Sequence, residues 1–307
     1  MSGVTSPPTA GNAALPKYLA LGDSIAFGYA GHPTPPPGGG SPYNNAAAFI
    51  GYPAYVGQSF GLDTTNAACP GETSGSFITA SAPDNGCHAF KAAFPLHVSY
   101  SGESQLQFAD EFLKSHSDTQ LVTIHTGADD GLLVIEQCGG LAGSACINAE
   151  LGTTLSTISA NLTTIVQSLR ANGYDGDMVL VNFYSLNYAN AAETNLVRQL
   201  NSTIAGVASA QHLELADAFT AFQHAADRTG GDTCATGLLG TGSSVLGRCD
   251  LHPDTLGQQL LATTVENAVL QNTQTPLPST SLPALLPTPR PTTSTGVSTN
   301  PLLRGIP

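Results

Sequence analysis

The stretch YLALGDSIAFGYAG, residues 18–31, indicates how the chain is organised. Its apolar run Tyr18–Leu21 predicts a buried strand. The run breaks at Gly22, Asp23 and Ser24, and apolar residues then resume. An acid and a hydroxyl are unusual where a chain enters its core. The pattern therefore indicates that the polar pair lies just beyond the carboxyl end of the strand, at the rim of a sheet.

Strand-like and helix-like segments alternate along the rest of the chain. The strand candidates are 17–21, 62–67, 120–125, 177–183 and 211–216. Helix candidates with apolar residues at nearly 3.6-residue spacing are 149–172, 189–209 and about 254–271. This alternation predicts an α/β fold with a five-stranded, mostly parallel sheet and helices on both faces. In such sheets ligands bind beyond the carboxyl ends of the strands.

The two ends of the chain differ in composition from its body. Residues 1–16 are mostly small and include proline, and residues 273–307 are rich in Pro, Thr and Ser. Neither segment can bury enough side chain to offset the entropy of ordering. We expect a flexible segment at 1–16, one folded domain at 17–272 and a disordered tail at 273–307.

Charge and hydropathy exclude several classes of partner. The formal net charge is −13, with only nine Lys and Arg residues, which argues against nucleic acid and anionic membranes as partners. No apolar run reaches the ~18 residues of a transmembrane helix. We therefore expect a protein without a transmembrane segment, and we expect it to be a monomer.

Six cysteines fall into three local pairs along the chain. Of the fifteen possible connectivities, we favour disulfides between neighbours, which would join Cys69–Cys87, Cys138–Cys146 and Cys234–Cys249. The alternative is six buried free thiols. Disulfides imply an oxidising compartment, so we expect a secreted or extracytoplasmic protein. The first 18 residues lack the pattern of a signal peptide.

Three further polar stretches fall at predicted strand ends or helix starts. NAACPGETSGSF (66–77) contains Gly71, whose N–H could donate to an oxyanion, and VTIHTGADDG (122–131) contains Asp129. CDLHPDTLGQQLLA (249–262) holds His252 on a loop, because Pro253 disfavours helical geometry at the residue before it. Pro253 would open the helix that follows. Each stretch alone is also compatible with an ordinary turn or cap.

Taken in order, these stretches resemble the sequence blocks of the SGNH/GDSL hydrolase superfamily, in particular its secreted bacterial lipases and esterases. The matching blocks are ALGDSIAFG (20–28), NAACPGETS (66–74), TGADDG (126–131) and DLHP (250–253). The resemblance covers about residues 17–272. It implies a flavodoxin-like, three-layer α/β/α sandwich and ester hydrolysis through an acyl-serine, with no metal or cofactor. No Gly-x-Ser-x-Gly surrounds Ser24, which disfavours the ordinary α/β-hydrolase fold.

The resemblance assigns Ser24 as the nucleophile and His252 as the general base. It assigns the oxyanion hole to the N–H groups of Ser24 and Gly71 and to the side chain at position 129. The family usually has Asn in that place, whereas this chain has Asp129. An ionised Asp accepts hydrogen bonds but cannot donate one. Three alternatives remain open: a protonated Asp129 that donates, a slow enzyme with two backbone donors, and a non-catalytic relative.

The third member of the catalytic group is also open. The family often has Asp three residues before the His, but here that position is Cys249 and Asp250 lies two residues before. We prefer Asp250 as the partner of His252, with a backbone carbonyl near Cys249 as the alternative. The resemblance implies a carboxylesterase or lipase acting on a small-molecule or lipid ester. The alternatives are a carbohydrate deacetylase of the same fold and an inactive, ligand-binding relative.

Overall fold

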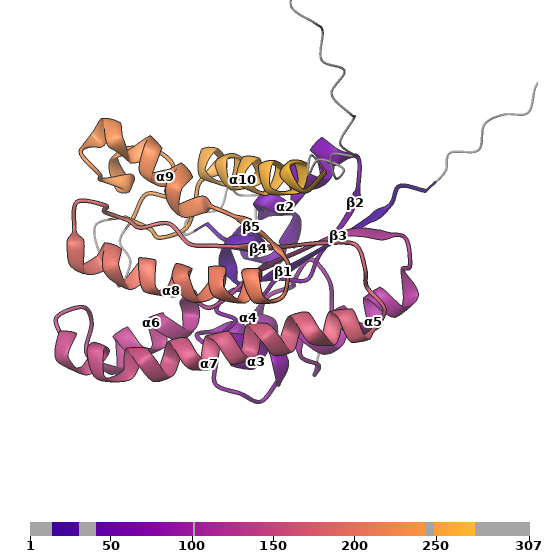
Figure 1. Ribbon diagram of the computed structural model, residues 1–307, viewed down its shortest axis with the longest axis horizontal. Coiled ribbons are helices and arrows are strands. Elements are labelled where there is room, and N and C mark those ends of the chain that lie inside the picture. The colour runs from indigo at the N-terminus through magenta and orange to yellow at the C-terminus, as the bar shows by residue number, and fades with distance from the viewer. Residues whose placement is uncertain (1–13, 31–40, 101, 243–248, 274–307) are drawn as a thin grey trace, which may run out of the picture. The chain divides into compact units, whose positions relative to one another are not determined.

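A five-stranded sheet, in which all strands are parallel, forms the centre of the molecule (Figure 1). The computed structural model describes residues 14–30, 41–100, 102–242 and 249–273. The strands, in the spatial order β2-β1-β3-β4-β5, are β1 (Lys17–Gly22), β2 (Asp63–Asn66), β3 (Thr119–His125), β4 (Asp177–Val181) and β5 (Glu214–Ala216). This order is that of flavodoxin-like folds, and the chain reverses its direction of travel across the sheet between β1 and β3.

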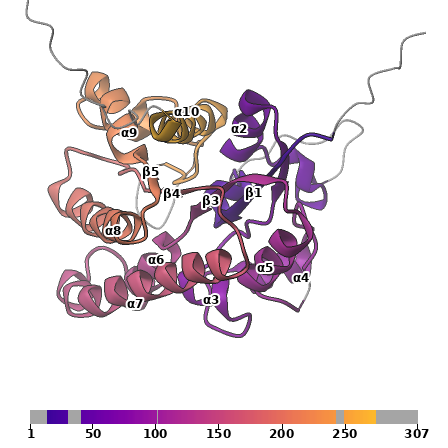
Figure 2. The same cartoon turned by 45° about the vertical axis from the view of Figure 1, so that its right-hand side comes forward.

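Helices cover both faces of the sheet (Figures 1 and 2). One face carries α2 (Tyr52–Phe60), α9 (Ala218–Ala226) and α10 (Thr255–Thr273), and the other carries α5 (Gln105–Ser115), α7 (Ser144–Ala171) and α8 (Ala191–Ala210). The remaining helices are α1 (Ser24–Phe27), α3 (Ser74–Ile78), α4 (Cys87–Ala93) and α6 (Ala128–Gln137). Single 3-10 turns occur at Pro42–Asn44, Ala46–Ala48, Asp227–Thr229 and Thr233–Ala235. The three-layer α/β/α fold expected from the sequence is confirmed.

The burial of the strands and helices explains why these segments form. The run Tyr18–Leu21 of β1 is completely buried, as expected for a parallel strand that is covered on both faces. Helix α7 buries one stripe of side chains against its neighbours, spaced by four, three and four residues: Ile158, Leu162, Ile165 and Leu169. This spacing is that of one helical face.

The predicted strands and long helices are all present, with shifts at their ends. Strand β4 ends two residues earlier than predicted, because the Asn201 side chain takes both the N–H of Phe183 (2.9 Å) and its carbonyl (2.6 Å). Helix α10 begins at Thr255, so Pro253 does not open it as we expected. Asp254 accepts the N–H groups of the first turn instead. Pro253 is one residue further out, in a β-bridge with Leu239.

The cysteines pair as predicted, in the disulfides Cys69–Cys87, Cys138–Cys146 and Cys234–Cys249, and the alternative of free thiols is wrong. Within the described ranges, no helix is both long enough and apolar enough to cross a bilayer. Residues 1–13 and 274–307 lie outside the described part of the chain. The flexible segment at 1–16 and the disordered tail at 273–307 therefore remain predictions.

Candidate active site

Ser24 is the first residue of α1, directly after the turn that ends β1. Gly22 has a φ of +144°, and a Cβ at this position would lie 2.2 Å from the carbonyl oxygen of His125 on β3. Only glycine permits this approach of the two strand ends. Asp23 caps α1, since its Oδ1 accepts the N–H of Ile25 at 3.0 Å. The polar pair that interrupts the apolar sequence is therefore a helix cap followed by a serine at the rim of the sheet.

Ser24, His252 and Asp250 form a continuous hydrogen-bonded chain. The Oγ of Ser24 lies 2.9 Å from Nε2 of His252, although 228 residues separate them. On the other side of the ring, Nδ1 of His252 lies 2.7 Å from Oδ1 of Asp250. The side chains of His252 and Asp250 are 15% and 11% exposed, so the ring is shielded but within reach of solvent. Of the two partners considered for His252, Asp250 is thus the one at hydrogen-bond distance.

The loop that carries His252 is fixed from several sides. The carbonyl of His252 accepts the N–H of Gly240 at 2.9 Å, and the carbonyl of Leu251 accepts the hydroxyl of Tyr184 at 2.5 Å. The ring of Tyr29 meets the imidazole edge-on, with 4.7 Å between centroids. The disulfide Cys234–Cys249 ties the start of this loop to the body of the protein. These contacts hold the imidazole beside Ser24.

Gly71 lies in the loop that follows β2, opposite Asn85. Its φ is +83°, and a Cβ would lie 2.4 Å from the carbonyl oxygen of Asn85. The N–H of Asn85 donates to the carbonyl of Gly71 at 2.8 Å. The disulfide Cys69–Cys87 encloses this pairing. Among the described residues, the N–H groups of Gly71 and Ser24 have no acceptor.

Asp129 lies in the first turn of α6, just beyond β3. It is only 5% exposed, and its Oδ1 accepts a hydrogen bond from Nδ2 of Asn85 at 2.8 Å. Burial, followed by the neighbouring charge of Asp23, raises the pKa of Asp129 well above its usual value. Asn85 thus connects the backbone of Gly71 to the carboxyl of Asp129.

Asp130, the neighbour of Asp129 in the chain, joins α6 to α3. Its carboxyl accepts the N–H of Ser74 at 2.8 Å and the hydroxyl of Ser74 at 2.7 Å. Burial raises the pKa of Asp130 above its usual value. The hydrogen bonds give Asp130 a positioning role for the loop that contains Gly71.

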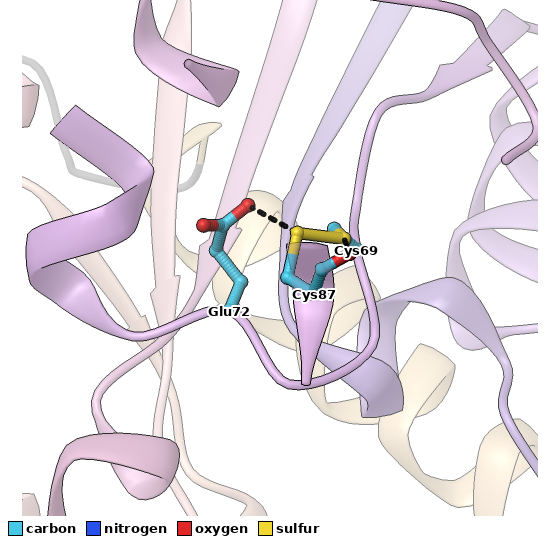
Figure 3. Close-up of side chains that lie close together, drawn as sticks. All are labelled: Cys69, Glu72 and Cys87. Carbon is cyan, nitrogen blue, oxygen red and sulfur yellow. Dashed lines mark hydrogen bonds between the residues drawn. A yellow bond between two sulfur atoms is a disulfide. The ribbon is translucent and has the colours of Figure 1, made fainter. Parts of the chain in front are cut away.

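Glu72 is buried beside the disulfide Cys69–Cys87 (Figure 3). Its Oε2 lies 3.4 Å from Sγ of Cys87. By residue type these three side chains could hold a metal ion, but the disulfide leaves no thiolate to act as a ligand. Glu72 instead accepts hydrogen bonds from the hydroxyl of Ser76 and the amide of Gln105. The cluster is therefore structural.

Gln105 links this cluster to the turn before Ser24. Its Oε1 accepts the N–H of Gly22 at 2.5 Å, and its Nε2 donates to the carbonyl of Gly22 at 2.9 Å. The same Nε2 donates to Glu72 at 3.1 Å. The loop with Gly71 and the turn with Ser24 are thus held by one side chain from α5.

An apolar cavity of about 140 Å³ extends from this region between α6, α7 and α8. Its lining includes Ile25, Ala128 and Leu251, which are the chain neighbours of Ser24, Asp129 and His252. Most of the remaining lining is aliphatic, including Leu132, Leu155, Ile158, Leu196 and Leu200. The cavity therefore lies next to residues that flank the hydrogen-bonded serine and histidine in the chain, and it can take an apolar group.

These features define a class of protein: an α/β/α fold with a Ser-His-Asp arrangement at the carboxyl edge of a parallel sheet. Within it, the chain belongs to the GDSL-like Lipase/Acylhydrolase family, whose sequence pattern matches residues 20–260. This confirms the resemblance to GDSL hydrolases. No curated protein matches the sequence.

Several solved structures have a similar fold. The phospholipase A1 from Streptomyces albidoflavus NA297 is 20% identical, with a TM-score of 0.54, over 83% of this chain and 100% of that one. The extracellular lipase from Streptomyces rimosus is 18% identical, with a TM-score of 0.53, over 82% and 99%. A catalytic mutant of an acetylxylan esterase from Geobacillus stearothermophilus is 17% identical, with a TM-score of 0.51, over 83% and 94%. At these identities the likeness establishes the fold.

Sequence reasoning missed Asn85, Gln105 and Glu72, although all three are close to the predicted residues. Asn85 lies 44 residues before Asp129 in the chain, and Gln105 lies 83 residues after Gly22. Asn85 belongs to a Pro-Asp-Asn-Gly sequence that reads as an ordinary turn. Nothing in the local sequence indicates that these amides reach the site.

Proposed function

We propose that the protein is a serine ester hydrolase that acts through an acyl-serine intermediate. The observation that carries this proposal is the hydrogen-bonded chain from Ser24 through His252 to Asp250. A serine hydroxyl is a weak nucleophile until an adjacent base can take its proton. The Nε2 of His252 is at the distance required for that transfer, and Asp250 would hold Nδ1 protonated, which leaves Nε2 free to accept.

In the acylation half-reaction, Ser24 Oγ attacks the carbonyl carbon of the ester while Nε2 of His252 takes the hydroxyl proton. The carbonyl oxygen becomes an oxyanion. When the tetrahedral intermediate collapses, the bond to the alcohol oxygen breaks, and Nε2–H gives its proton to that oxygen. The alcohol leaves, and the acyl group remains on Ser24. Asp250 stabilises the imidazolium that exists between the two proton transfers.

In the deacylation half-reaction, a water molecule attacks the acyl-serine and passes a proton to Nε2 of His252. Collapse breaks the bond between the acyl carbon and Ser24 Oγ, and Nε2–H returns the proton to that oxygen. The carboxylic acid leaves, and the site is restored. The partial exposure of His252 supports this step, because water must reach the imidazole.

The oxyanion is proposed to bind to the N–H groups of Ser24 and Gly71. Ser24 begins α1, where the backbone N–H has no partner within the helix. Gly71 is held by its pairing with Asn85 and likewise has a free N–H among the described residues. Each donor of this kind is worth on the order of 10²–10³ in turnover. The side chain of Asp129 is proposed as the third member of the hole.

The apolar cavity supports a carboxylesterase or lipase rather than a deacetylase. An apolar cavity of about 150 Å³ holds a benzene-sized group, so a cavity of about 140 Å³ has room for about six carbons. An acetyl group has no chain to fill it. The preferred substrates are therefore proposed to be esters of medium or longer acyl chains. The three disulfides support a secreted or extracytoplasmic location.

The proposal is tested with a fluorophosphonate probe, which labels an activated serine covalently. The wild type should be labelled and should hydrolyse p-nitrophenyl esters, and Ser24→Ala should do neither. Ser115→Ala, at an exposed serine that ends α5, is the matched control and should behave as the wild type. A folded wild type without labelling or hydrolysis would contradict the proposal and would favour an inactive ligand-binding relative.

A further inference from the structure

Asp129 occupies a position in which a negative charge would oppose the proposed reaction, yet its surroundings do not favour that charge. The side chain is 5% exposed and has no cationic partner among the described residues. Its one hydrogen-bond partner there is the neutral amide of Asn85. Burying an unpaired charge is strongly unfavourable, and a carboxyl in such a place takes up a proton instead.

The ionisable groups that act on Asp129 are all acids. They are Asp23 ahead of α1, Asp130 on α6 and Glu72 in the loop after β2, and together with burial they raise the pKa of Asp129. The basic groups of the region pair with or act on acids other than Asp129. His125 on β3 is paired with Asp23, Lys91 on α4 acts on Glu72, and His252 is paired with Asp250. From α7, Asn161 brings only a neutral amide, which donates to Ser74.

The hydrogen bonds show which acid of this group is best suited to hold a proton. Asp23 accepts two N–H donors, from Ile25 and His125. Asp130 accepts two donors from Ser74, and Glu72 accepts donors from Ser76 and Gln105. Asp129 accepts one. Because donors stabilise the ionised form of a carboxyl, the acid with the fewest donors among these buried carboxyls is the one that stays neutral.

We propose, building on the function proposed above, that Asp129 is a neutral carboxylic acid whose O–H donates the third hydrogen bond to the oxyanion. Asn85 is the positioning residue of this acid. A neutral carboxyl has one oxygen that only accepts and one that donates. Since Nδ2–H of Asn85 faces Oδ1, the proton resides on Oδ2. The hydrogen bond forms with the oxyanion and is released when the intermediate collapses, and no proton is transferred.

A neutral Asp129 makes turnover depend on pH in a way that an Asn in this position would not. When pH rises through the raised pKa of Asp129, the O–H donor is lost and a negative charge appears beside the oxyanion. Turnover should then fall. An Asn at this position has no proton to lose in this range, so its amide should keep donating and turnover should show no such fall.

The first test is the ratio of kcat for Asp129→Asn to kcat for the wild type, measured against pH. The contribution of His252 is common to both and cancels. At low pH, where both side chains donate, the ratio should be close to one. Above the pKa of Asp129 it should rise to about 100-fold or more, the value of one lost oxyanion donor. A ratio that does not change with pH overturns the inference.

The second test uses Asn85→Ala, which removes the donor to Oδ1. That donor lowers the pKa of Asp129, so its loss should move the alkaline fall in kcat to higher pH. A merely structural role for Asn85 would lower activity without moving the fall, and that result overturns its assignment as a positioning residue. Asp63→Asn, at an exposed acid paired with Lys17, is the control and should leave the profile unchanged.

The third test is thermal unfolding, which needs no activity. A carboxyl whose pKa is higher in the folded state than in the unfolded state loses its stabilising effect as pH rises between the two values. The Tm of Asp129→Asn minus that of the wild type should therefore increase with pH from about 4, the usual Asp value, and level off above the folded pKa. A constant difference overturns the inference. If the fluorophosphonate probe labels neither the wild type nor any variant, but the Tm difference still increases with pH, only the proposed function is rejected.

Discussion

Filling the apolar cavity should abolish the proposed preference for longer acyl chains. Gly131 lies on α6 and lines the cavity, and a Cβ at this position would meet no atom within 4 Å. Gly131→Phe therefore places a benzene-sized ring into the cavity without a backbone clash. Since an apolar cavity of about 150 Å³ holds one benzene, a single phenyl ring should occupy most of the 140 Å³ available.

The size of the effect follows from the burial of methylene groups. Each buried CH₂ contributes about 0.8 kcal/mol, which corresponds to about fourfold in kcat/KM. Four methylenes separate an acetyl from a hexanoyl ester, so the wild type should prefer hexanoyl by up to about 200-fold. The gain should level off beyond about six carbons, where the cavity is full. In Gly131→Phe this preference should collapse, while hydrolysis of the acetyl ester persists because Ser24, His252 and Asp250 are untouched.

The assay is kcat/KM on p-nitrophenyl esters from acetyl to octanoyl. Gly152→Phe is the matched control, because Gly152 is an exposed glycine of α7 with equally open space around its Cβ and does not line the cavity. Both variants exchange a helical glycine for the same residue, so their effects on helix propensity are equal. A Gly131→Phe enzyme that keeps the fourfold rise per carbon, or a Gly152→Phe enzyme that loses it, would refute the assignment of this cavity to the acyl chain.

The remaining predictions concern the support of the site and the stability of the fold. Asp250→Ala should lower kcat by about 10²–10⁴-fold with little change in KM. A near-normal kcat would instead indicate that a backbone carbonyl near Cys249 orients the ring of His252. Replacing Cys234 and Cys249 by Ser removes a disulfide with a sequence separation of 15. A disulfide of this loop length contributes about 3 kcal/mol to the free energy of unfolding. On heating, this double variant should lose activity before far-UV ellipticity, and simultaneous loss would contradict a local role. Gly22→Ala should lower the free energy of unfolding by about 2–4 kcal/mol in denaturant titrations, because its φ is +144° and its Cβ meets the His125 carbonyl. Gly131→Ala should instead raise it by about 0.5–1 kcal/mol, and a loss of stability there would contradict the open space around this helical position.

The fold could be predicted from sequence because its signals are local. Strand β1 contains the short apolar run Tyr18–Leu21, and α7 shows one apolar stripe. The ends of the elements were less predictable, because hydrogen bonds to residues outside the element decide them. Strand β5 starts at Glu214 and not near 211, since the N–H of Leu213 bonds to the carbonyl of Ala208 at the end of α8. Such contacts depend on how the helix meets the strand and leave no mark in the pattern.

The candidate site was predictable only in part, for a related reason. Ser24 and His252 stand in recognisable sequence blocks, and the structure places them at hydrogen-bond distance. The choice between Asp250 and a carbonyl required geometry, because either group can reach the ring from a neighbouring residue. The cavity could not be predicted at all. It arises between three helices, and its lining residues show the same apolar spacing as residues of the closed core.

Neutral amide side chains do most of the positioning around Ser24. Gln105 from α5 holds both the N–H and the carbonyl of Gly22, and Gln258 from α10 donates to the carbonyl of Ile25. The turn is therefore fixed from both helical layers of the molecule, and Asn85 fixes Asp129 in the same manner. An amide can satisfy a donor and an acceptor together without adding charge. Only 10% of the residues are charged, and the positioning amides add no charge. The buried acids therefore dominate the electrostatic field near Ser24. The gain or loss of a proton by one of these acids should change that field strongly.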